Sequence, residues 1–435
     1  MQNSRAREPE RRGRDGVGRT LKGVSRAAVC PTLLLATLAL PAQAQIQVVG
    51  ASAQPDGFRI GPIRLQPTLA IRNIGVDNNV FNSSSGRRTD NTFVFAPGLR
   101  AYWPVGERIR LVGRAGLDIA YFARESEERY VDSAASGDIE IDVGPLMFFG
   151  GGGGGNHRSR FTIEIDERVK RHIEHARAGL LARIGSRARV AFEASTDRET
   201  YDEATAQNGD VIKRALDRRN VAGSVELRYR ITHKTTLVTL ARRDEDEFTN
   251  DPTPNEAQSY LYLGGLELSP KALMGGAVLF GARVFPPTEQ QVVPVHTGLA
   301  YRATIERRLT WFALAEVLAL RDIEYSVYPG NSARNERNSY EYSRVTLRLS
   351  FALPKDVVAR SAVGYERSDY LLPVEQAGAS IDRVDRRVTL QGALLWPVGK
   401  HLRVGGTVTW AQRRSNFQGI DYRGASYGIT AELRQ

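Results

Sequence analysis

The sequence predicts an all-β protein: a transmembrane, antiparallel, up-and-down β-barrel of about 18 strands, within a range of 16 to 18. Three observations predict it, namely an export signal, segments of about ten residues in which apolar and polar side chains alternate, and connections of unequal length between these segments. The 435 residues include 41 Gly and only 3 Met, and no long apolar segment follows the first fifty residues. One large β domain fits this composition better than several soluble cores.

The first 44 residues have the layout of a secretory signal peptide. Basic residues between Arg5 and Arg26 precede the apolar stretch Ala27–Leu40, and Ala42-Gln43-Ala44 forms a cleavage site before Gln45. The apolar stretch is shorter than the roughly 20 residues that a spanning helix needs. We expect a signal peptide at residues 1–44, a short periplasmic segment at 45–62, and a barrel at 63–435 in the outer membrane of a Gram-negative bacterium. A start at a later codon would shorten the basic region.

Charge and cysteine content argue against other classes of protein. The net charge is +11, and residues 1–44 hold eight basic and three acidic side chains, which leaves +6 for the remainder. Lysine and arginine alternate with acidic residues and form no patch with aromatic residues, so nucleic acid is not an expected partner. The single cysteine, Cys30, stands at the start of the apolar stretch and before the cleavage site, which argues against acylation.

Alternation with a period of two recurs along the mature chain. In residues 221–231, Val225, Leu227 and Tyr229 alternate with Glu226 and Arg228. A soluble β-sandwich also alternates, but its strands are about five or six residues long and its connections are short at both ends. Longer segments here favour a barrel, with one face toward lipid and one toward water. Similar alternation is present at residues 109–121, 161–166, 344–351 and 427–434.

The connections fall into two classes, which set the strand count. Long polar loops are expected at residues such as 197–219, 243–258, 325–339 and 367–386. Nine loops, eight turns and both termini on the turn side give eighteen strands, an even number as is usual for single-chain bacterial barrels. The eight short turns are expected at Pro104–Gly106, Gly185–Ser186, His233–Lys234, Pro270–Lys271, Arg307–Arg308, Pro354–Lys355, Pro397–Gly399 and the glycine run Gly150–Gly155.

Tryptophan placement supports the same orientation. Trp103 and Trp396 lie in near-identical segments, each just before a short turn, and Trp311 just follows another turn. An amphipathic indole ring suits the headgroup level of a membrane. We therefore predict that these three residues mark the periplasmic girdle and that Trp410, further along its strand, belongs to the outer one.

The start of the mature chain resembles a known family. Gly61-Pro62-Ile63-Arg64-Leu65-Gln66-Pro67-Thr68-Leu69 is followed by Val76-Asp77-Asn78-Asn79-Val80-Phe81, and then by Asp90-Asn91-Thr92-Phe93 and Ala96-Pro97-Gly98-Leu99. This opening of about forty residues is similar to that of the β-barrel porin 2 family, some of whose members are associated with exopolysaccharide export. The resemblance implies an outer-membrane barrel and, as one role, a polysaccharide conduit. The end departs from the family, because most such barrels finish on an aromatic residue and this chain finishes on Leu433-Arg434-Gln435.

Signals for catalysis or cofactor binding are few. His172 and His175 are expected in a loop, and residues three apart on a strand would point to opposite faces. His157, His233 and His401 are expected at turns, without a serine or aspartate spacing typical of a nucleophile site. Asp77-Asn78-Asn79 could bind Ca²⁺, although Asx turns explain the same residues. We expect no enzyme, cofactor or metal site.

The remaining candidate site is the barrel lumen. If the assigned faces are right, rows of arginine and acidic residues line a water-filled pore, and an excess of arginine would favour anions modestly. Pairing of these charges along the wall is an equally open alternative. The predicted lining comprises Arg110, Arg114, Asp118, Glu164, Asp166, Glu226, Arg228, Arg230, Arg302, Arg344, Arg348, Arg360 and Arg403, accompanied by Glu140, Asp142 and Glu193.

Three functions are compatible with the sequence. The first is a porin-like channel for hydrophilic solutes, the second an export conduit for exopolysaccharide, and the third a non-conducting surface scaffold or adhesion barrel. An intrinsically closed lumen would favour the second or third. The expected partners are outer-membrane lipid and lipopolysaccharide, the barrel-assembly machinery and, for the second function, periplasmic components of polysaccharide export.

Overall fold

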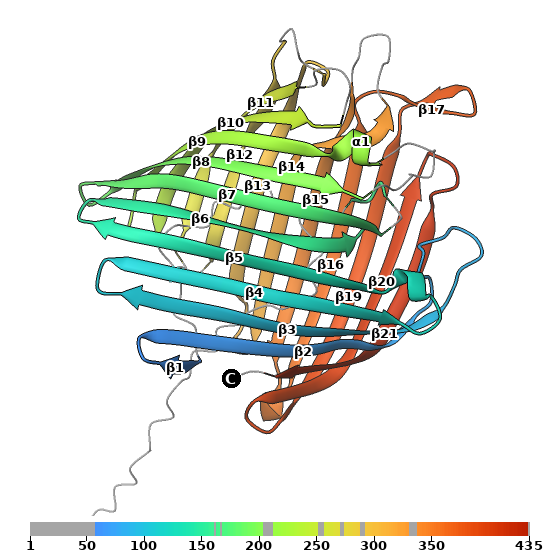
Figure 1. Ribbon diagram of the computed structural model, residues 1–435, viewed down its shortest axis with the longest axis horizontal. Helices are drawn as coiled ribbons and strands as arrows, with labels where there is room; N and C mark the ends of the chain where they lie inside the picture. The colour runs from blue at the N-terminus through green and yellow to red at the C-terminus, as the bar shows by residue number, and fades with distance from the viewer. Residues whose placement is uncertain are drawn as a thin grey trace, which may run out of the picture. The chain divides into compact units, whose positions relative to one another are not determined.

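A computed structural model describes residues 57–160, 162–165, 168–202, 212–250, 256–269, 274–287, 292–329 and 337–433. Within these residues the chain forms a closed antiparallel barrel (Figure 1). Each wall strand pairs with the next wall strand, and the last, β21 (Tyr422–Leu433), pairs back with the first, β2 (Ile63–Asp77). In lipid, closure is what leaves no row of unpaired backbone groups. The first half of the wall comprises β2 (Ile63–Asp77), β3 (Asp90–Val105), β4 (Ile109–Phe122), β5 (Tyr130–Val143), β6 (Leu146–Ser159), β7 (Val169–Ile184), β8 (Ala188–Tyr201), β9 (Arg218–Arg230) and β10 (Thr235–Phe248).

The second half of the wall completes eighteen barrel strands, which confirms the predicted fold class and count. Its members are β11 (Glu256–Leu268), β12 (Gly275–Phe285), β13 (His296–Arg308), β14 (Ala313–Pro329), β15 (Arg337–Ala352), β16 (Val358–Tyr370), β19 (Val384–Val398), β20 (Leu402–Ser415) and β21 (Tyr422–Leu433). Strands of 11 to 17 residues exceed the usual length in a soluble sandwich and suffice to cross a bilayer at a tilt.

The few remaining elements lie outside the main wall. β1 (Phe58–Ile60) folds back on the start of β2, and β17 (Val374–Gln376) pairs with β18 (Ala379–Ile381) in the connection between β16 and β19. The helical pieces are α1 (Ile212–Leu216), η1 (Ser126–Glu128) and η3 (Pro354–Asp356). None of the helices among the described residues has the length and apolar character needed to cross a membrane.

The two ends of the barrel differ in their connections. We call the end with the eight short connections and the first and last strand ends the turn end, and the end with the nine longer connections the loop end. Gly106, Gly185 and Gly399 have positive φ in three of the predicted turns, a conformation that glycine adopts without a steric penalty. Another expected turn, Pro270–Lys271, lies outside the described residues.

One predicted turn is wrong. Gly150–Gly155 lies within β6, and the turn between β5 and β6 is at Gly144-Pro145, where Gly144 has φ 60°. A glycine run has low strand propensity, so the sequence alone favours a turn. In the folded barrel these residues pair with β5 and β7 on both sides. An added Cβ at Gly153 would lie 2.3 Å from the Ala135 carbonyl oxygen, so the close approach of the strands requires glycine there.

Side chains alternate between the lumen and the outer surface, as the barrel requires. On β9, Val225, Leu227 and Tyr229 are about 40% exposed on the outer face, whereas Ala222 and Glu226 are buried on the lumen face. Large apolar side chains are exposed in the same way on strands around the wall. Exposure of so much apolar surface is the expected state of a wall that lipid covers.

The glycine run provides a test of the wall's packing. We expect Gly153→Ala to lower the stability of the folded barrel by roughly 1–3 kcal/mol, because the new methyl group meets backbone of β5. Gly137→Ala on β5 is the matched control, since an added Cβ there meets nothing within 4 Å. The midpoint of heat modifiability on unboiled gels measures both. Equal midpoints for the two variants would contradict the packing described for β6.

Candidate functional site in the barrel lumen

The lumen wall near the turn end carries a network of ion pairs. Arg110 on β4 lies 2.9 Å from Glu140 and 3.1 Å from Asp142, both on β5, and Asp142 is also 2.7 Å from Arg183 on β7. Arg230, from the predicted lining, donates to the backbone oxygen of Ser186 at this end. The cross-strand spacing brings oppositely charged side chains on one face within reach of each other.

The same arrangement continues toward the middle of β4. Arg114 lies 3.6 Å from Asp138, which also pairs with Arg177 at 2.9 Å. Asp118 pairs with Arg72, a residue of β2 that the sequence reasoning did not select. Each predicted charge here therefore has a partner on a neighbouring or next-nearest strand.

The far side of the wall is paired in the same way. Arg302 lies 3.5 Å from Asp322, which also binds Arg283. Arg344 is 3.2 Å from Glu366. Arg348 is 3.1 Å from Glu316. Two further sets belong to the predicted lining. Arg228 pairs with Glu226 and Glu267, and Arg360 lies 3.5 Å from Glu432. Glu432 stands opposite Arg403 in the β20–β21 register.

Several residues of this network were not among the predicted lining residues, although the alternation of apolar and polar side chains marks their face. On β12, Val278, Phe280 and Ala282 share the outer face. Arg283 comes next in the alternation and therefore lies on the lumen face. It is 3.2 Å from Asp244 as well as bound to Asp322. Carrying the alternation through every strand, rather than only the clearest ones, would have selected it.

Glu164 is not on a strand. Residues 162–165 belong to the connection between β6 and β7, so the expected strand at 161–166 is wrong for the residues described, and Asp166 lies outside them. Glu164 accepts hydrogen bonds from Ser326 Oγ at 2.5 Å, the Val327 amide at 3.1 Å and Tyr370 Oη at 3.0 Å. Alternation over six residues could not distinguish a strand from a loop whose apolar residues are buried elsewhere.

These contacts cross the barrel. The partners of Glu164 lie on β14 and β16, the two neighbours of β15. Eight strands lie between β6 and β15 in either direction around the ring, so β15 is on the opposite side of the barrel from β6. The β6–β7 connection therefore reaches the opposite wall at the loop end. Burial raises the pKa of Glu164, an effect that the nearby Arg383 guanidinium and the three hydrogen bonds oppose.

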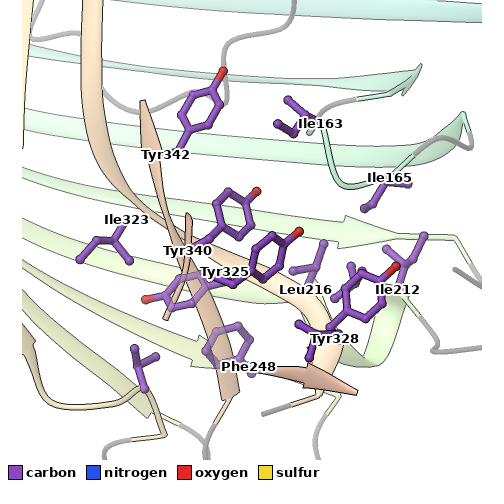
Figure 2. Close-up of a cluster of buried hydrophobic side chains, with 14 of the residues drawn as sticks. Ile163, Ile165, Ile212, Leu216, Phe248, Ile323, Tyr325, Tyr328, Tyr340 and Tyr342 are labelled. Carbon is purple, nitrogen blue, oxygen red and sulfur yellow. The ribbon is translucent and has the colours of Figure 1, made fainter. Parts of the chain in front are cut away.

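A buried apolar cluster surrounds this crossing. The loop-end cluster, as we call it, includes Ile163 and Ile165 of the β6–β7 connection, Ile212 and Leu216 of α1, and tyrosines of β14–β16. Figure 2 shows these side chains facing a common space inside the wall. Arg337 on β15 donates to the Ala215 carbonyl oxygen at 2.8 Å, so α1 is also tied to the far wall. The aromatic members of the cluster include Phe248, Tyr325, Tyr328, Tyr340, Tyr342, Tyr370 and Phe417.

Two fully buried arginines support the far side of the cluster. Arg383 pairs with Asp385 at 2.7 Å, and Arg413 pairs with the same carboxylate at 3.0 Å. The Arg383 guanidinium lies 4.4 Å from the ring centre of Tyr328 and 4.6 Å from that of Tyr370. Buried charges are costly unless paired, so aromatic faces and a shared carboxylate are suitable surroundings for Arg383.

The tryptophans occupy the positions that their sequence context suggested, while their contact with the membrane interface stays a prediction. Trp103 and Trp396 each lie two residues before the end of a strand at the turn end, with 41% and 47% of their surface exposed. Trp311 lies in the turn between β13 and β14 and is 83% exposed. Trp410 lies on β20 opposite Leu390 and Ala425.

The histidines are placed differently from the sequence expectation. His172 and His175 lie on β7 and His157 on β6, whereas the first two were expected in a loop and the third at a turn. His233 and His401 do lie in turns. Among the described residues, no group of three or more His, Cys, Asp and Glu side chains has an arrangement that could hold a metal ion.

Several solved structures are similar to this chain at low sequence identity. The siderophore receptor PirA from Pseudomonas aeruginosa is 11% identical, with a TM-score of 0.47, over 88% of this chain and 81% of the receptor. PirA from Acinetobacter baumannii is 6% identical, with a TM-score of 0.44, over the same shares. A bacterial polysaccharide outer membrane secretin is 7% identical, with a TM-score of 0.34, over 85% of this chain and 98% of the secretin.

A comparison with curated proteins found no significant match. A family model described as "Putative beta-barrel porin 2" matches residues 51–435, which is most of the chain and the whole of the barrel. This confirms the resemblance seen in the opening residues of the mature sequence. The chain is therefore an outer-membrane-type β-barrel that belongs to the β-barrel porin 2 family.

Proposed function

We propose that this protein is a gated, porin-like channel for hydrophilic solutes in the bacterial outer membrane, with its turn end in the periplasm and its loop end outside. The charged lumen wall is the observation that carries the proposal: ion-paired side chains line the inner face from β2 to β21. Barrels of sixteen to eighteen strands are wide enough to hold an aqueous channel. A polar lining of this kind serves passage of water-soluble molecules better than catalysis or lipid transport.

The pairing of the lining charges sets the expected selectivity. Each arginine beside a carboxylate contributes a local dipole rather than an unbalanced positive field. We therefore propose the predicted residues as pore lining with weak anion preference. Charged side chains of both signs also favour hydrophilic over apolar solutes.

The loop-end cluster makes the channel gated rather than permanently open. Residues 162–165 bind the opposite wall through Glu164, and α1 binds it through Arg337. Movement of such loops, held by a few hydrogen bonds and side-chain contacts, is a common way of controlling access to a site. Opening in our proposal is release of residues 162–165 from β14 and β16.

A second candidate is a conduit for exopolysaccharide, which the family resemblance implies. The specific observation in its favour is the occluding loop-end cluster with its many tyrosines, because an export path must stay shut without polymer and aromatic rings stack on sugars. Under this alternative, periplasmic export components would act as partners at the turn end. A non-conducting surface scaffold is the third candidate. It predicts that the folded, inserted barrel shows no conductance in the planar-bilayer experiment below.

Removal of the Glu164 side chain tests the gate. We expect Glu164→Ala to raise the open probability in planar bilayers, because three hydrogen bonds worth about 3 kcal/mol together would be lost, which is roughly a 100-fold shift in the closed-to-open ratio. Glu375→Ala, an exposed glutamate of β17, is the control and should conduct like the parent protein.

The same recordings separate the candidate functions. Salt-dependent openings that neutral oligosaccharides do not block support a solute channel, and block by long oligosaccharides supports the conduit. Folded, inserted protein that stays silent in both the parent and Glu164→Ala forms would contradict both, and would leave the scaffold.

The proton equilibrium of Glu164 gives a second prediction. Because its pKa is raised when residues 162–165 are docked, docking takes up a proton and is favoured as the pH falls. This stabilisation of the docked state is complete below the ordinary glutamate pKa of 4.5. It is lost as the pH rises through the pKa that Glu164 has when residues 162–165 are docked. The charged and titratable groups that face Glu164 are Arg383, Tyr340 and Tyr370.

Conductance should therefore fall on acidification. Glu164→Gln, which mimics the protonated side chain, should stay largely closed and lose the pH dependence, whereas the parent protein opens as the pH is raised. Single-channel recording from pH 4 to pH 8 measures this. A parent and a Glu164→Gln channel with the same pH profile would place the titrating group elsewhere.

A further inference from the structure

A hollow of about 590 Å³ lies on the wall at the loop end of β3–β8. Its apolar part consists of Phe93, Ile119, Tyr121 and Val131, which are 37–58% exposed on the outer face. Their strand neighbours Ala120 and Phe122 are buried on the lumen side. These four exposed side chains therefore place the open side of the hollow on the outer, lipid-facing surface of the wall.

An aromatic and cationic stack closes one side of the hollow. The rings of Phe93 and Tyr121 are 5.3 Å apart, and the Arg129 guanidinium lies 4.2 Å from the centre of the Tyr121 ring. Arg129 Nε donates to the Phe122 carbonyl oxygen at 2.8 Å, and Arg158 donates to the carbonyl oxygen of Arg129 at 3.1 Å. The bond to Phe122 holds the Arg129 side chain over the Tyr121 ring, and the bond from Arg158 holds the Arg129 backbone.

The charges around the hollow are mainly positive. Lys170 faces outward on the opposite side, 66% exposed, at 3.6 Å from Asp202, which is the only carboxylate among the described residues that line the hollow. His172 beside it contacts Asn156 at 2.9 Å and Glu174 at 3.2 Å. Arg171 and His157 also line the hollow, but they pair with Glu199 and Asp132 on the lumen face.

We propose that this hollow binds one phosphorylated glycolipid of the outer leaflet. Acyl chains would lie on Phe93, Ile119 and Val131, and a headgroup phosphate would lie between Arg129 and Lys170. Aromatic side chains with cations on their loop-end side match the order of groups in such a lipid, from acyl chain to phosphate. The site does not depend on conduction through the lumen and rests only on the loop end being outside.

Native mass spectrometry of the detergent-solubilised, folded barrel tests the proposal, with bisphosphorylated lipid A as the probe. We expect one lipid to stay bound to the parent protein, and Arg129→Gln/Lys170→Gln to bind roughly 10- to 30-fold more weakly, since each cation near a membrane surface contributes about 1 kcal/mol. The matched control is Arg219→Gln/Arg243→Gln, which removes two exposed outward charges at the loop ends of β9 and β10. Lys170→Gln alone, an exposed site, should show part of the loss without affecting folding.

Three results would overturn the proposal. The first is equal lipid A binding by the parent and double-variant proteins when both show the same heat modifiability. The second is equal binding of dephosphorylated lipid A, which would leave only an apolar surface. The third is equal binding of phosphatidylglycerol, which would assign the hollow to phospholipid rather than to the outer-leaflet glycolipid.

Discussion

Closure of the hydrogen-bonded ladder between β2 and β21 is the constraint on which the rest of the structure depends. β2 pairs with β3 on one side and, over Leu69–Asp77, with β21 on the other, so the described wall strands close into a ring. In hydrocarbon an unpaired backbone group costs several kcal/mol, and closure removes that cost for the whole wall. Stability is thus not concentrated in a compact apolar core, and the inner face is free to carry charge.

The charges on the inner face are arranged in pairs of opposite sign. Arginines and carboxylates meet across strands, as for Arg110 with Glu140 and Arg344 with Glu366. Pairing lowers the cost of holding charge in a narrow space, and it also weakens the net field along the pore. The largest buried apolar cluster of the described residues lies at one end, where two connections fold inward and meet the far wall. Selectivity in our proposal is therefore a property of the wall, and access a property of the loop end.

Much of this could be predicted from sequence, because a membrane barrel repeats one local rule. The alternation of Val225, Glu226 and Leu227, and the turn at Gly185-Ser186, depend only on nearby residues, so the strand count and most turns followed from them. The prediction of a turn at Gly150–Gly155 was wrong because these residues lie in a strand that β5 and β7 approach closely. No local sequence pattern contains that approach.

The candidate site was less predictable for the same physical reason. The face of Arg110 or Arg344 follows from alternation, but the partner of each charge depends on strand register. Glu164 is the extreme case, since its hydrogen-bond partners are 162 to 206 residues away in sequence. Its flanking residues Ile163 and Ile165 mimic a strand, although their apolar character serves the loop-end cluster.

Docking of residues 162–165 on the far wall is tested most directly by cross-linking. The described barrel contains no cysteine, so Ile163→Cys with Val327→Cys places two thiols in the loop-end cluster without competing reactions and keeps the backbone amide that binds Glu164. We predict that a short, reducible bis-thiol reagent links this pair and holds the channel closed until reduction, whereas Ile163→Cys with Thr346→Cys, deeper on β15, does not link. Failure of the first pair to link in folded protein, or an unchanged conductance after linkage, would contradict the gate.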